Sequence, residues 1–329
     1  MKTEDRNTFL DINLRAIKKN YKIIKNKIGK HCTAAATVKA NAYGLGIRKV
    51  IPSLVDSGCK NFFVATTDEA IELRKINKKI KIFILNGLIL KNIKLIKKYN
   101  LIPIINNLSQ LRRIEYFQNK NKTNIKIALH FDTGMSRLGL DESETKYLIQ
   151  NKYKLLKFSK LVLVMSHLAC ADNPKSELNK KQLLKFLNLR KHFPAVPLSL
   201  SNSAGILLGK KYHFDMVRPG ISLYGGHCRL NERKIYHNVV TLKSKLIQVR
   251  EIKKNDSIGY GATYKAKTKM KIGTLSLGYA DGINRLFSNN LNIHYKSKKI
   301  KVVGRISMDL ITLDLSNIKK NEKLDKIIL

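Results

Sequence analysis

Residues 61–85, NFFVATTDEAIELRKINKKIKIFIL, contain one complete unit of the pattern that decides the fold. The apolar run from Asn61 to Ala65 is followed by an amphipathic segment, Thr67 to Ile76, whose first residues, Thr and Asp, are typical of a helix N-terminus. A second apolar run extends from Ile80 to Leu85. Short apolar runs that alternate with helical segments are typical of a parallel sheet whose strands are connected by helices.

The same alternation continues through the N-terminal part of the chain. It predicts eight strands: Thr33 to Val38, Asn61 to Ala65, Ile80 to Leu85, Leu101 to Ile105, Ile125 to His130, Leu161 to Ser166, Val196 to Ser201 and Phe214 to Val217. Eight is the number of strands that closes a (β/α)8 barrel. The sequence therefore predicts an α/β fold that begins with such a barrel.

After Gly226 the pattern changes to lysine-rich alternating runs, separated by turn signals such as Lys254-Asn255-Asp256. This alternation predicts a mostly antiparallel β domain. We therefore expect two domains, residues 1–226 and residues 227–329. The final stretch, KKNEKLDKIIL, shows no closing strand, so we expect the β domain to expose an unpaired edge.

The chain is strongly basic, because 64 Lys and Arg residues against 23 Asp and Glu residues give a formal net charge of +41. Such a charge favours a nucleic acid or an anionic membrane as partner. The lysines are, however, spread along the whole chain and accompany many Asn and Ile residues, which share A/T-rich codons with Lys. We attribute the charge to genome composition and expect no specific nucleic-acid partner, although weak polyanion binding at low salt follows from it.

The sequence also favours a cytoplasmic protein without membrane contact. No apolar run approaches the ~18 residues that a membrane span needs, and the start MKTEDRNTFL lacks the apolar region of a signal peptide. The cysteines are scattered, with no C-x-x-C pair and no histidine cluster at metal-ligand spacing. We therefore expect neither disulfide bonds nor a metal site.

Residues of chemical interest follow five of the predicted strands, where the C-terminal face of a barrel carries its active site. They are Lys39 after the first strand, Arg137 after the fifth, His167 after the sixth, Ser203 after the seventh, and Arg218, Gly220 and Ile221 after the eighth. A lysine amine in a partly desolvated pocket can act as a nucleophile or a base. The Ser203 hydroxyl and the backbone N–H groups near Gly220 are suited to binding a phosphate.

Eight stretches carry a specific resemblance to a known family. They are AAATVKANAYGLG, DTGMSRLG, MSHLACAD, SNSAGIL, DMVRPGISLYG, IGYGATYKA, LGYADGINR and VGRISMD. In order and spacing they are similar to the motifs of the alanine racemase family. The resemblance implies an isomerase that interconverts L- and D-alanine with pyridoxal 5'-phosphate as cofactor, and that supplies D-alanine for cell-wall peptidoglycan.

The resemblance also implies roles for residues of the barrel. Lys39 matches the lysine that binds the cofactor as a Schiff base and serves as one catalytic base. Arg218 matches the arginine that faces the pyridine nitrogen, His167 the histidine that links Arg218 towards Tyr260, and Arg137 the arginine that steadies Tyr260 and the substrate carboxylate. The positions that hold the cofactor phosphate correspond to Tyr43, Ser203, Gly220 and Ile221.

Four further site residues lie in the β domain and, by the resemblance, act in the barrel of a partner subunit. Tyr260 matches the second catalytic base, and Met308 matches the residue whose backbone N–H binds the substrate carboxylate. Tyr279 and Asp309 match residues that line the entry. The resemblance thus implies a homodimer. Two bases agree with the chemistry, because racemisation removes a proton from one face of the α-carbon and returns one to the other.

Two departures from the family pattern leave alternatives open. Many members carry a carbamate-modified lysine where this chain has His130, so another group or an anion must orient Arg137. Members also continue for some forty residues beyond the position of Leu329, including a tyrosine that binds the cofactor phosphate. The alternatives are a racemase of broader amino-acid specificity, and a shortened, inactive relative that acts only as a basic binding protein.

Overall fold

The computed structural model describes residues 6–89, 92–229, 233–295, 298–318 and 327–328. The chain forms two compact units, residues 13–239 in one and residues 1–12 with 240–329 in the other. The division therefore lies beyond the boundary expected at residue 226. Residues 1–12, which the sequence places in the barrel domain, belong to the second unit because strand β1 (Thr8–Ile12) pairs there with β11 (Val240–Ser244).

The first unit is a (β/α)8 barrel, as the sequence predicts, and each of the eight predicted strands is present. Its strands are β2 (Thr33–Ala34), β3 (Ala36–Thr37), β4 (Asn61–Val64), β5 (Lys81–Ile84), β6 (Ile102–Ile105), β7 (Ile125–His130), β8 (Ser159–Met165), β9 (Leu198–Ser199) and β10 (Met216–Val217). The first predicted strand is divided into β2 and β3. Strands β3 to β9 form one parallel sheet in sequence order, and β10 pairs in parallel with β2.

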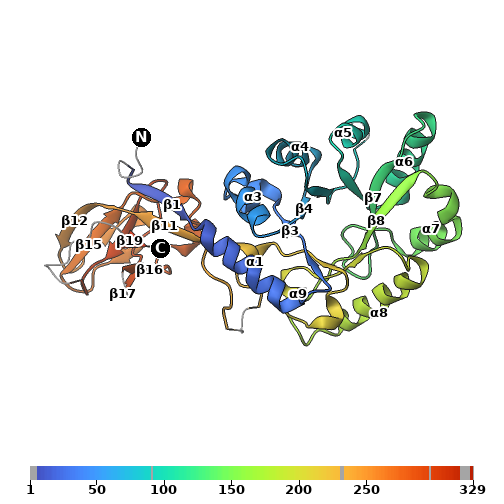
Figure 1. Ribbon diagram of the computed structural model, residues 1–329. Coiled ribbons are helices and arrows are strands. Elements are labelled where there is room, and N and C mark those ends of the chain that lie inside the picture. The colour runs from blue at the N-terminus through green and yellow to red at the C-terminus, as the bar shows by residue number, and fades with distance from the viewer. Residues whose placement is uncertain (1–5, 90–91, 230–232, 296–297, 319–326, 329) are drawn as a thin grey trace. The chain divides into compact units, whose positions relative to one another are not determined.

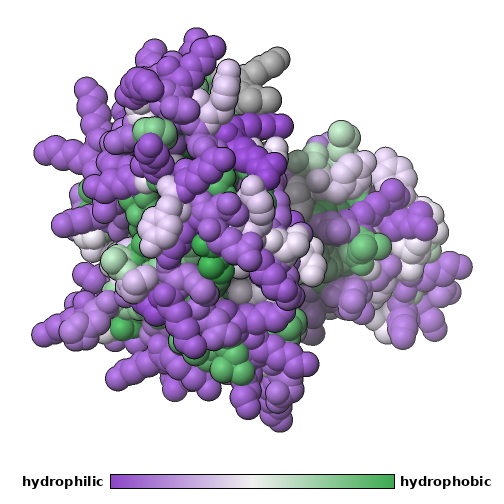
Figure 2. Space-filling view, turned by 90° about the vertical axis from the view of Figure 1, so that its right-hand side faces the viewer, coloured by the Kyte–Doolittle hydropathy of each residue, from purple (hydrophilic) through white to green (hydrophobic). Residues whose placement is uncertain are grey.

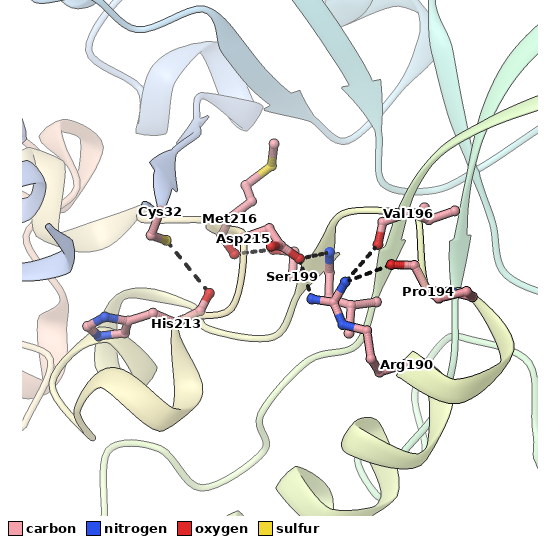
Figure 3. Close-up of polar contacts among 9 residues, drawn as sticks. Cys32, Arg190, Pro194, Val196, Ser199, His213, Asp215 and Met216 are labelled. Carbon is pink, nitrogen blue, oxygen red and sulfur yellow. Dashed lines mark hydrogen bonds and ion pairs between the residues drawn. The ribbon is translucent and has the colours of Figure 1, made fainter. Parts of the chain in front are cut away.

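Hydrogen bonds at β10 complete the ring of strands. Asp215 N donates to Leu198 O at 3.1 Å on one side, and Thr33 N donates to Asp215 O at 2.9 Å on the other. Side chains reinforce the join between β9 and β10 (Figure 3). The Asp215 carboxylate accepts a hydrogen bond from Leu198 N at 2.7 Å and pairs with Arg190 Nη2 at 2.6 Å. The last strand of the barrel is therefore bonded to both of its neighbours.

Helices lie between consecutive strands and surround the sheet (Figure 1). They are α1 (Leu14–Ile28), α2 (Lys39–Tyr43), α3 (Ile47–Asp56), α4 (Thr67–Ile76), α5 (Ile93–Lys98), α6 (Leu108–Lys120), α7 (Glu142–Leu155), α8 (Glu177–His192), α9 (Ser203–Ile206), η3 (Lys210–Tyr212) and η4 (Ile221–Tyr224). The predicted helix after β4 has the predicted bounds, because Thr66 and Glu69 form a capping box at its start. Figure 2 shows mainly hydrophilic side chains on one face of the molecule, with apolar ones in small groups, as expected where amphipathic helices turn their polar sides outward.

The barrel interior is filled by side chains and is not a pore. Phe63 and Phe83 stack with ring centroids 4.6 Å apart, and Ala35, Ala128 and Leu163 belong to the same buried cluster. Aromatic, branched and small side chains from successive strands thus pack together in the interior. This packed interior supports the residues that follow the strands at the C-terminal face.

The second unit consists of antiparallel sheets, as predicted. Its elements are β1, β11, β12 (Leu246–Ile252), β13 (Ser257–Ile258), η5 (Tyr260–Ala262), β14 (Tyr264–Lys265), β15 (Met270–Leu275), η6 (Tyr279–Asp281), η7 (Arg285–Phe287), β16 (Asn292–Tyr295), β17 (Lys298–Lys301), β18 (Ile311–Asp314) and β19 (Ile327–Ile328). One sheet has the order β1-β11-β19-β16-β17, and a second has the order β12-β15-β18. Leu275, Ile293 and Leu313 belong to the buried cluster of this unit.

The expectation that the final stretch adds no strand is wrong. Strand β19 pairs with β11, where Ser244 lies opposite Ile327, and with β16, where His294 lies opposite Ile328. It therefore occupies the middle of the five-stranded sheet. A strand of two described residues has too little alternation to be recognised in the sequence, and its pairing partners are distant along the chain.

Candidate active site

A cavity of about 520 Å³ lies at the C-terminal ends of the barrel strands. Eight of the twelve candidate residues line this cavity or belong to its wall: Lys39, Tyr43, Arg137, His167, Ser203, Arg218, Gly220 and Ile221. They come from five separate strand ends, so the barrel brings together residues that are far apart in the sequence. A larger hollow of about 950 Å³ lies among α5, α6 and α7 and contains none of the candidates.

Lys39 begins a left-handed turn. The four residues that follow it, Ala40 to Tyr43, have φ values of 52°, 53°, 56° and 57°. Residues other than glycine adopt this region at a cost of ~1 kcal/mol or more each, so the surrounding structure must hold the turn. Glu69 contributes, because its Oε1 accepts a hydrogen bond from Ala40 N at 2.6 Å and its Oε2 accepts one from Ala65 N at 2.7 Å. The turn directs both Lys39 and Tyr43 to the cavity.

Ser203, Gly220 and Tyr43 form a corner of hydrogen-bond donors. The Ser203 Oγ accepts hydrogen bonds from Gly220 N at 2.9 Å, from the Ser222 hydroxyl at 3.0 Å and from Ser222 N at 3.3 Å. Its lone pairs are thereby occupied, which leaves its own proton to be donated into the cavity. Burial raises the pKa of Tyr43, so that hydroxyl also stays protonated.

Position 220 must be glycine for this corner to form. A Cβ atom there would lie 2.3 Å from the Tyr43 hydroxyl oxygen, far inside van der Waals contact. The next residue, Ile221, is the first residue of η4, so its N–H has no acceptor within that helix. The backbone at 220–221 and two hydroxyl groups thus converge on one point of the cavity wall.

Arg218 is a buried cation beside His167. Its guanidinium donates to His167 Nδ1 at 3.3 Å and to the carbonyl oxygens of Ser166 and Leu200. No carboxylate in the described residues pairs with it, and its burial lowers its pKa to about 9, which leaves it charged at neutral pH. Burial, followed by the charge of Arg218, lowers the pKa of His167 well below its usual value. His167 is therefore neutral and accepts from Arg218 through Nδ1.

Arg137 belongs to a loop that a carboxylate organises. Asp132 accepts hydrogen bonds from Gly134 N, Met135 N and Ser136 N at 2.8–2.9 Å, so it caps the loop after β7. Within the described residues, the Arg137 guanidinium makes no hydrogen bond or ion pair with the protein, although it lines the cavity. A charged donor group is thus available at this side of the cavity.

The other four candidates belong to the second unit. Tyr260 lies in η5 and is 69% exposed, and Tyr279 lies in η6. The η6 segment contacts the segment of Met308 and Asp309, because Tyr279 N donates to Ser307 O and Ala280 N donates to Met308 O, each at 3.0 Å. Tyr279, Met308 and Asp309 therefore lie close together on this unit.

Three residues that take part in these arrangements were not among the sequence candidates. Glu69 holds the turn after Lys39, Asn106 bonds to His130 in the cavity wall, and the Arg305 guanidinium lies 3.1 Å from the Cβ position of Gly261, next to Tyr260. Arg305 stands in the VGRISMD stretch and could have been named from it. The other two act through backbone or side-chain contacts that no motif in this sequence indicated.

Two family models match the chain: the alanine racemase N-terminal domain over residues 12–228 and the alanine racemase C-terminal domain over residues 239–329. The chain belongs to the alanine racemase family. Among curated family members, the alanine racemase of Rickettsia canadensis is 40% identical over 314 residues, which cover 95% of this chain and 86% of the relative. That of Rickettsia akari is 40% identical over 310 residues, with 94% and 85% coverage.

Solved structures of alanine racemases have the same fold. The alanine racemase from Bartonella henselae with covalently bound pyridoxal phosphate is 33% identical, with a TM-score of 0.92 over 98% of this chain and 90% of that chain. The biosynthetic alanine racemase from Pseudomonas aeruginosa is 31% identical, with a TM-score of 0.90 and the same coverage. In the part of this family member that the structure describes, no helix is long and apolar enough to cross a membrane.

Proposed function

We propose that the chain is a cytoplasmic racemase that interconverts L- and D-alanine with pyridoxal 5'-phosphate and so supplies D-alanine for peptidoglycan. The observation that carries this proposal is the cavity in which Lys39 shares one space with a corner of phosphate-type donors and the buried cation Arg218. The curated relatives support alanine as substrate. The covalently bound cofactor of the Bartonella henselae enzyme supports the same cofactor here.

The cavity residues fit this cofactor. Lys39 offers a primary amine for covalent attachment. The hydroxyls of Tyr43 and Ser203 and the N–H of Ile221 would hold its phosphate, because these donors lie at one corner. The N–H of Gly220 would support them indirectly, because it donates to Ser203 Oγ. A buried cation without a carboxylate partner is suited to an uncharged ring nitrogen, so Arg218 would face the pyridine nitrogen.

The protein residues then perform the proton transfers. Pyridoxal phosphate, when bound, withdraws electrons from the α-carbon and makes its proton removable. We assign the two bases to Lys39 Nζ on one face and to the hydroxyl oxygen of Tyr260 on the other. A free tyrosine has a pKa near ~10, so Tyr260 needs a cationic neighbourhood, which Arg137 and the Arg218–His167 pair would supply.

Arg218 would favour racemisation over other reactions of the same cofactor. A guanidinium donates hydrogen bonds but keeps its protons, and a pKa of about 9 leaves Arg218 charged at neutral pH. Arg218 would therefore hold the pyridine nitrogen by a donated hydrogen bond without transferring a proton to it, and this role would favour return of the proton to the α-carbon over transamination.

The second unit would complete the site of a partner subunit in a homodimer. We assign the Met308 N–H and Arg137 to the substrate carboxylate, and Tyr279 and Asp309 to the entry. Exposure of Tyr260 and of the apolar side chains of Met308 (56%) and Leu286 (85%) supports an interface on this unit. Each active site would then need residues from two chains.

The decisive test is the absorption spectrum of the purified protein together with its activity on L- and D-alanine. The protein should carry the visible absorption band of lysine-bound cofactor and interconvert both isomers, and Lys39→Ala should lose the band and the activity. A Lys39→Ala protein that kept both would sink the assignment. Rates on serine and lysine would identify a racemase of broader specificity. Polynucleotide binding that persists above about 0.2 M salt, without racemisation, would favour a basic binding protein.

A further inference from the structure

His130 has one defined proton position. It ends strand β7 and is 7% exposed, and its Nδ1 lies 2.8 Å from Asn106 Oδ1. The Asn106 amide nitrogen donates to the carbonyl oxygens of Leu85 at 3.0 Å and Ile104 at 3.1 Å. Since these two acceptors fix the orientation of the amide, its oxygen faces His130 and can only accept. The proton of the imidazole must therefore be on Nδ1.

The other ring nitrogen, Nε2, is consequently a hydrogen-bond acceptor. Burial is the main reason that the pKa of His130 falls to about 3, so the ring is neutral at physiological pH. The charged groups that face it are Arg218 from the end of β10, and Asp132 and Arg137 from the loop after β7. No donor in the described residues bonds to Nε2, although His130 lines the cavity.

The imidazole ring of His130 packs against the loop that carries Arg137. The ring atom Cδ2 lies 3.2 Å from the Cβ position of Gly139, two residues after Arg137. The backbone joins the same two segments, because Leu140 N donates to His130 O at 2.7 Å. In the described residues, no acceptor is bonded to the N–H donors of Arg137. His130 lines the same cavity, and its Nε2 is an acceptor to which no donor is bonded.

We propose that His130 Nε2 accepts a hydrogen bond from the Arg137 guanidinium and positions it for the substrate carboxylate. The inference rests on the proposed function, which assigns that carboxylate to Arg137. A neutral acceptor orients the guanidinium without cancelling its charge. Asn106 acts on Arg137 indirectly, because it keeps the proton of His130 on Nδ1. Both are positioning residues.

The proton position can be tested without any activity measurement. In ¹⁵N-histidine NMR spectra of the holoenzyme at pH 7, the signals absent from His130→Gln identify His130. They should show a protonated Nδ1 and an unprotonated Nε2. A proton on Nε2, or on both nitrogens, would overturn the proposal whether or not the protein racemises alanine.

The link to Arg137 is tested by three variants, each first shown to retain the absorption band of lysine-bound cofactor. His130→Phe removes the acceptor and should raise the KM for alanine about tenfold or more, with a smaller change in kcat. His130→Gln can present an amide oxygen and should restore most of that loss. Equal KM values for His130→Phe and wild type would refute the positioning role.

Asn106→Asp provides the third variant and changes the pH profile. A carboxylate beside Nδ1 stabilises the protonated imidazole, so Nε2 becomes a donor that faces Arg137. The KM for alanine should therefore rise as the pH is lowered, at a pH where wild type is unaffected. His130→Gln in combination with Asn106→Asp should abolish this new dependence. If the KM of Asn106→Asp depended on pH as that of wild type does, the proposal would be contradicted. A wild-type protein that does not racemise alanine would instead refute the proposed function.

Discussion

Ser203 concentrates three accepted hydrogen bonds on one hydroxyl oxygen, and this arrangement frees its proton for a ligand. Removing the hydroxyl in Ser203→Ala should weaken binding of pyridoxal phosphate to the cofactor-free protein about ten- to a hundredfold, because a hydrogen bond to a charged group contributes ~1.5–3 kcal/mol. Fluorescence titration with the cofactor measures this directly.

Ser222→Ala is the matched control for Ser203→Ala. Ser222 donates to Ser203 through its hydroxyl and is equally buried, but it is not part of the cavity wall. Its substitution should weaken cofactor binding only a few fold. If both variants bound the cofactor equally well, Ser203 would have no direct role in holding the phosphate.

His130 also makes stability depend on pH. Its pKa of about 3 in the folded chain lies below its usual ~6.5, so between these values the unfolded chain holds a proton that the folded chain does not. The contribution of His130 to the free energy of unfolding is therefore complete above pH ~6.5. As the pH falls below this value, that free energy decreases by about 1.4 kcal/mol per pH unit. Urea unfolding between pH 7 and pH 4.5 should therefore show a flatter acid dependence for His130→Gln than for wild type.

His294→Gln is the control for this measurement, because His294 is exposed on β16. Its stability should follow the wild-type curve over the whole pH range. Parallel curves for wild type and His130→Gln would show that His130 is not held neutral by the fold.

The barrel residues of the candidate site could be predicted because some directly follow an apolar run, as Lys39 and Arg218 do, and because all fall in stretches that resemble motifs of the family. Glu69 and Asn106 could not be predicted in this way. Glu69 was recognisable only as a helix-capping residue, and its second contact, with Ala40 N, depends on a left-handed turn that the sequence ANAY does not indicate. The Asn106 contact depends on the packing of β6 against β7, which links residues 24 positions apart.

At the scale of elements, two interactions of the Asp215 carboxylate join β9 to β10. The hydrogen bond from Leu198 N should contribute more to stability than the ion pair with Arg190. Asp215→Ala should cost about 1–3 kcal/mol of unfolding free energy, because it leaves Leu198 N without an acceptor. Arg190→Met should cost at most about 1 kcal/mol, because the Arg190 and Asp215 side chains are 39% and 43% exposed. Urea denaturation of the two variants compares these contributions, and equal losses would show that the ion pair dominates.

The strands of the barrel could be predicted because they are short apolar runs between strong turn and helix signals. The sequence places β1 in the wrong domain and does not indicate β19, and both errors have the same physical reason. Each strand finds its partner far along the chain, β1 at β11 and β19 at β11 and β16, and local alternation carries no information about such pairings.

At the scale of the whole molecule, the proposed sharing of each site by two chains has a direct test. Lys39→Ala and Tyr260→Phe chains should each be inactive. After subunit exchange, a mixture should recover about a quarter of wild-type activity, because half of the dimers are mixed and one of their two sites retains both bases. Racemase assays after confirmed exchange measure the recovery, and specific activity should also fall on dilution. Failure to recover activity would place both bases on one chain or exclude Tyr260 as a base.

The pairing of β1 with β11 gives the order of synthesis a role in folding. Thr8 and Ser244 lie opposite each other in this pair although they are 236 positions apart in the chain. At a ribosomal rate of about 5–20 residues per second, β1 emerges some ten to fifty seconds before its partner strand exists. The intervening barrel has all of its strands by then, so it can fold first. Translation speed through the barrel, rather than any contact in the finished enzyme, sets how long the β1 edge is exposed to aggregation or to chaperones.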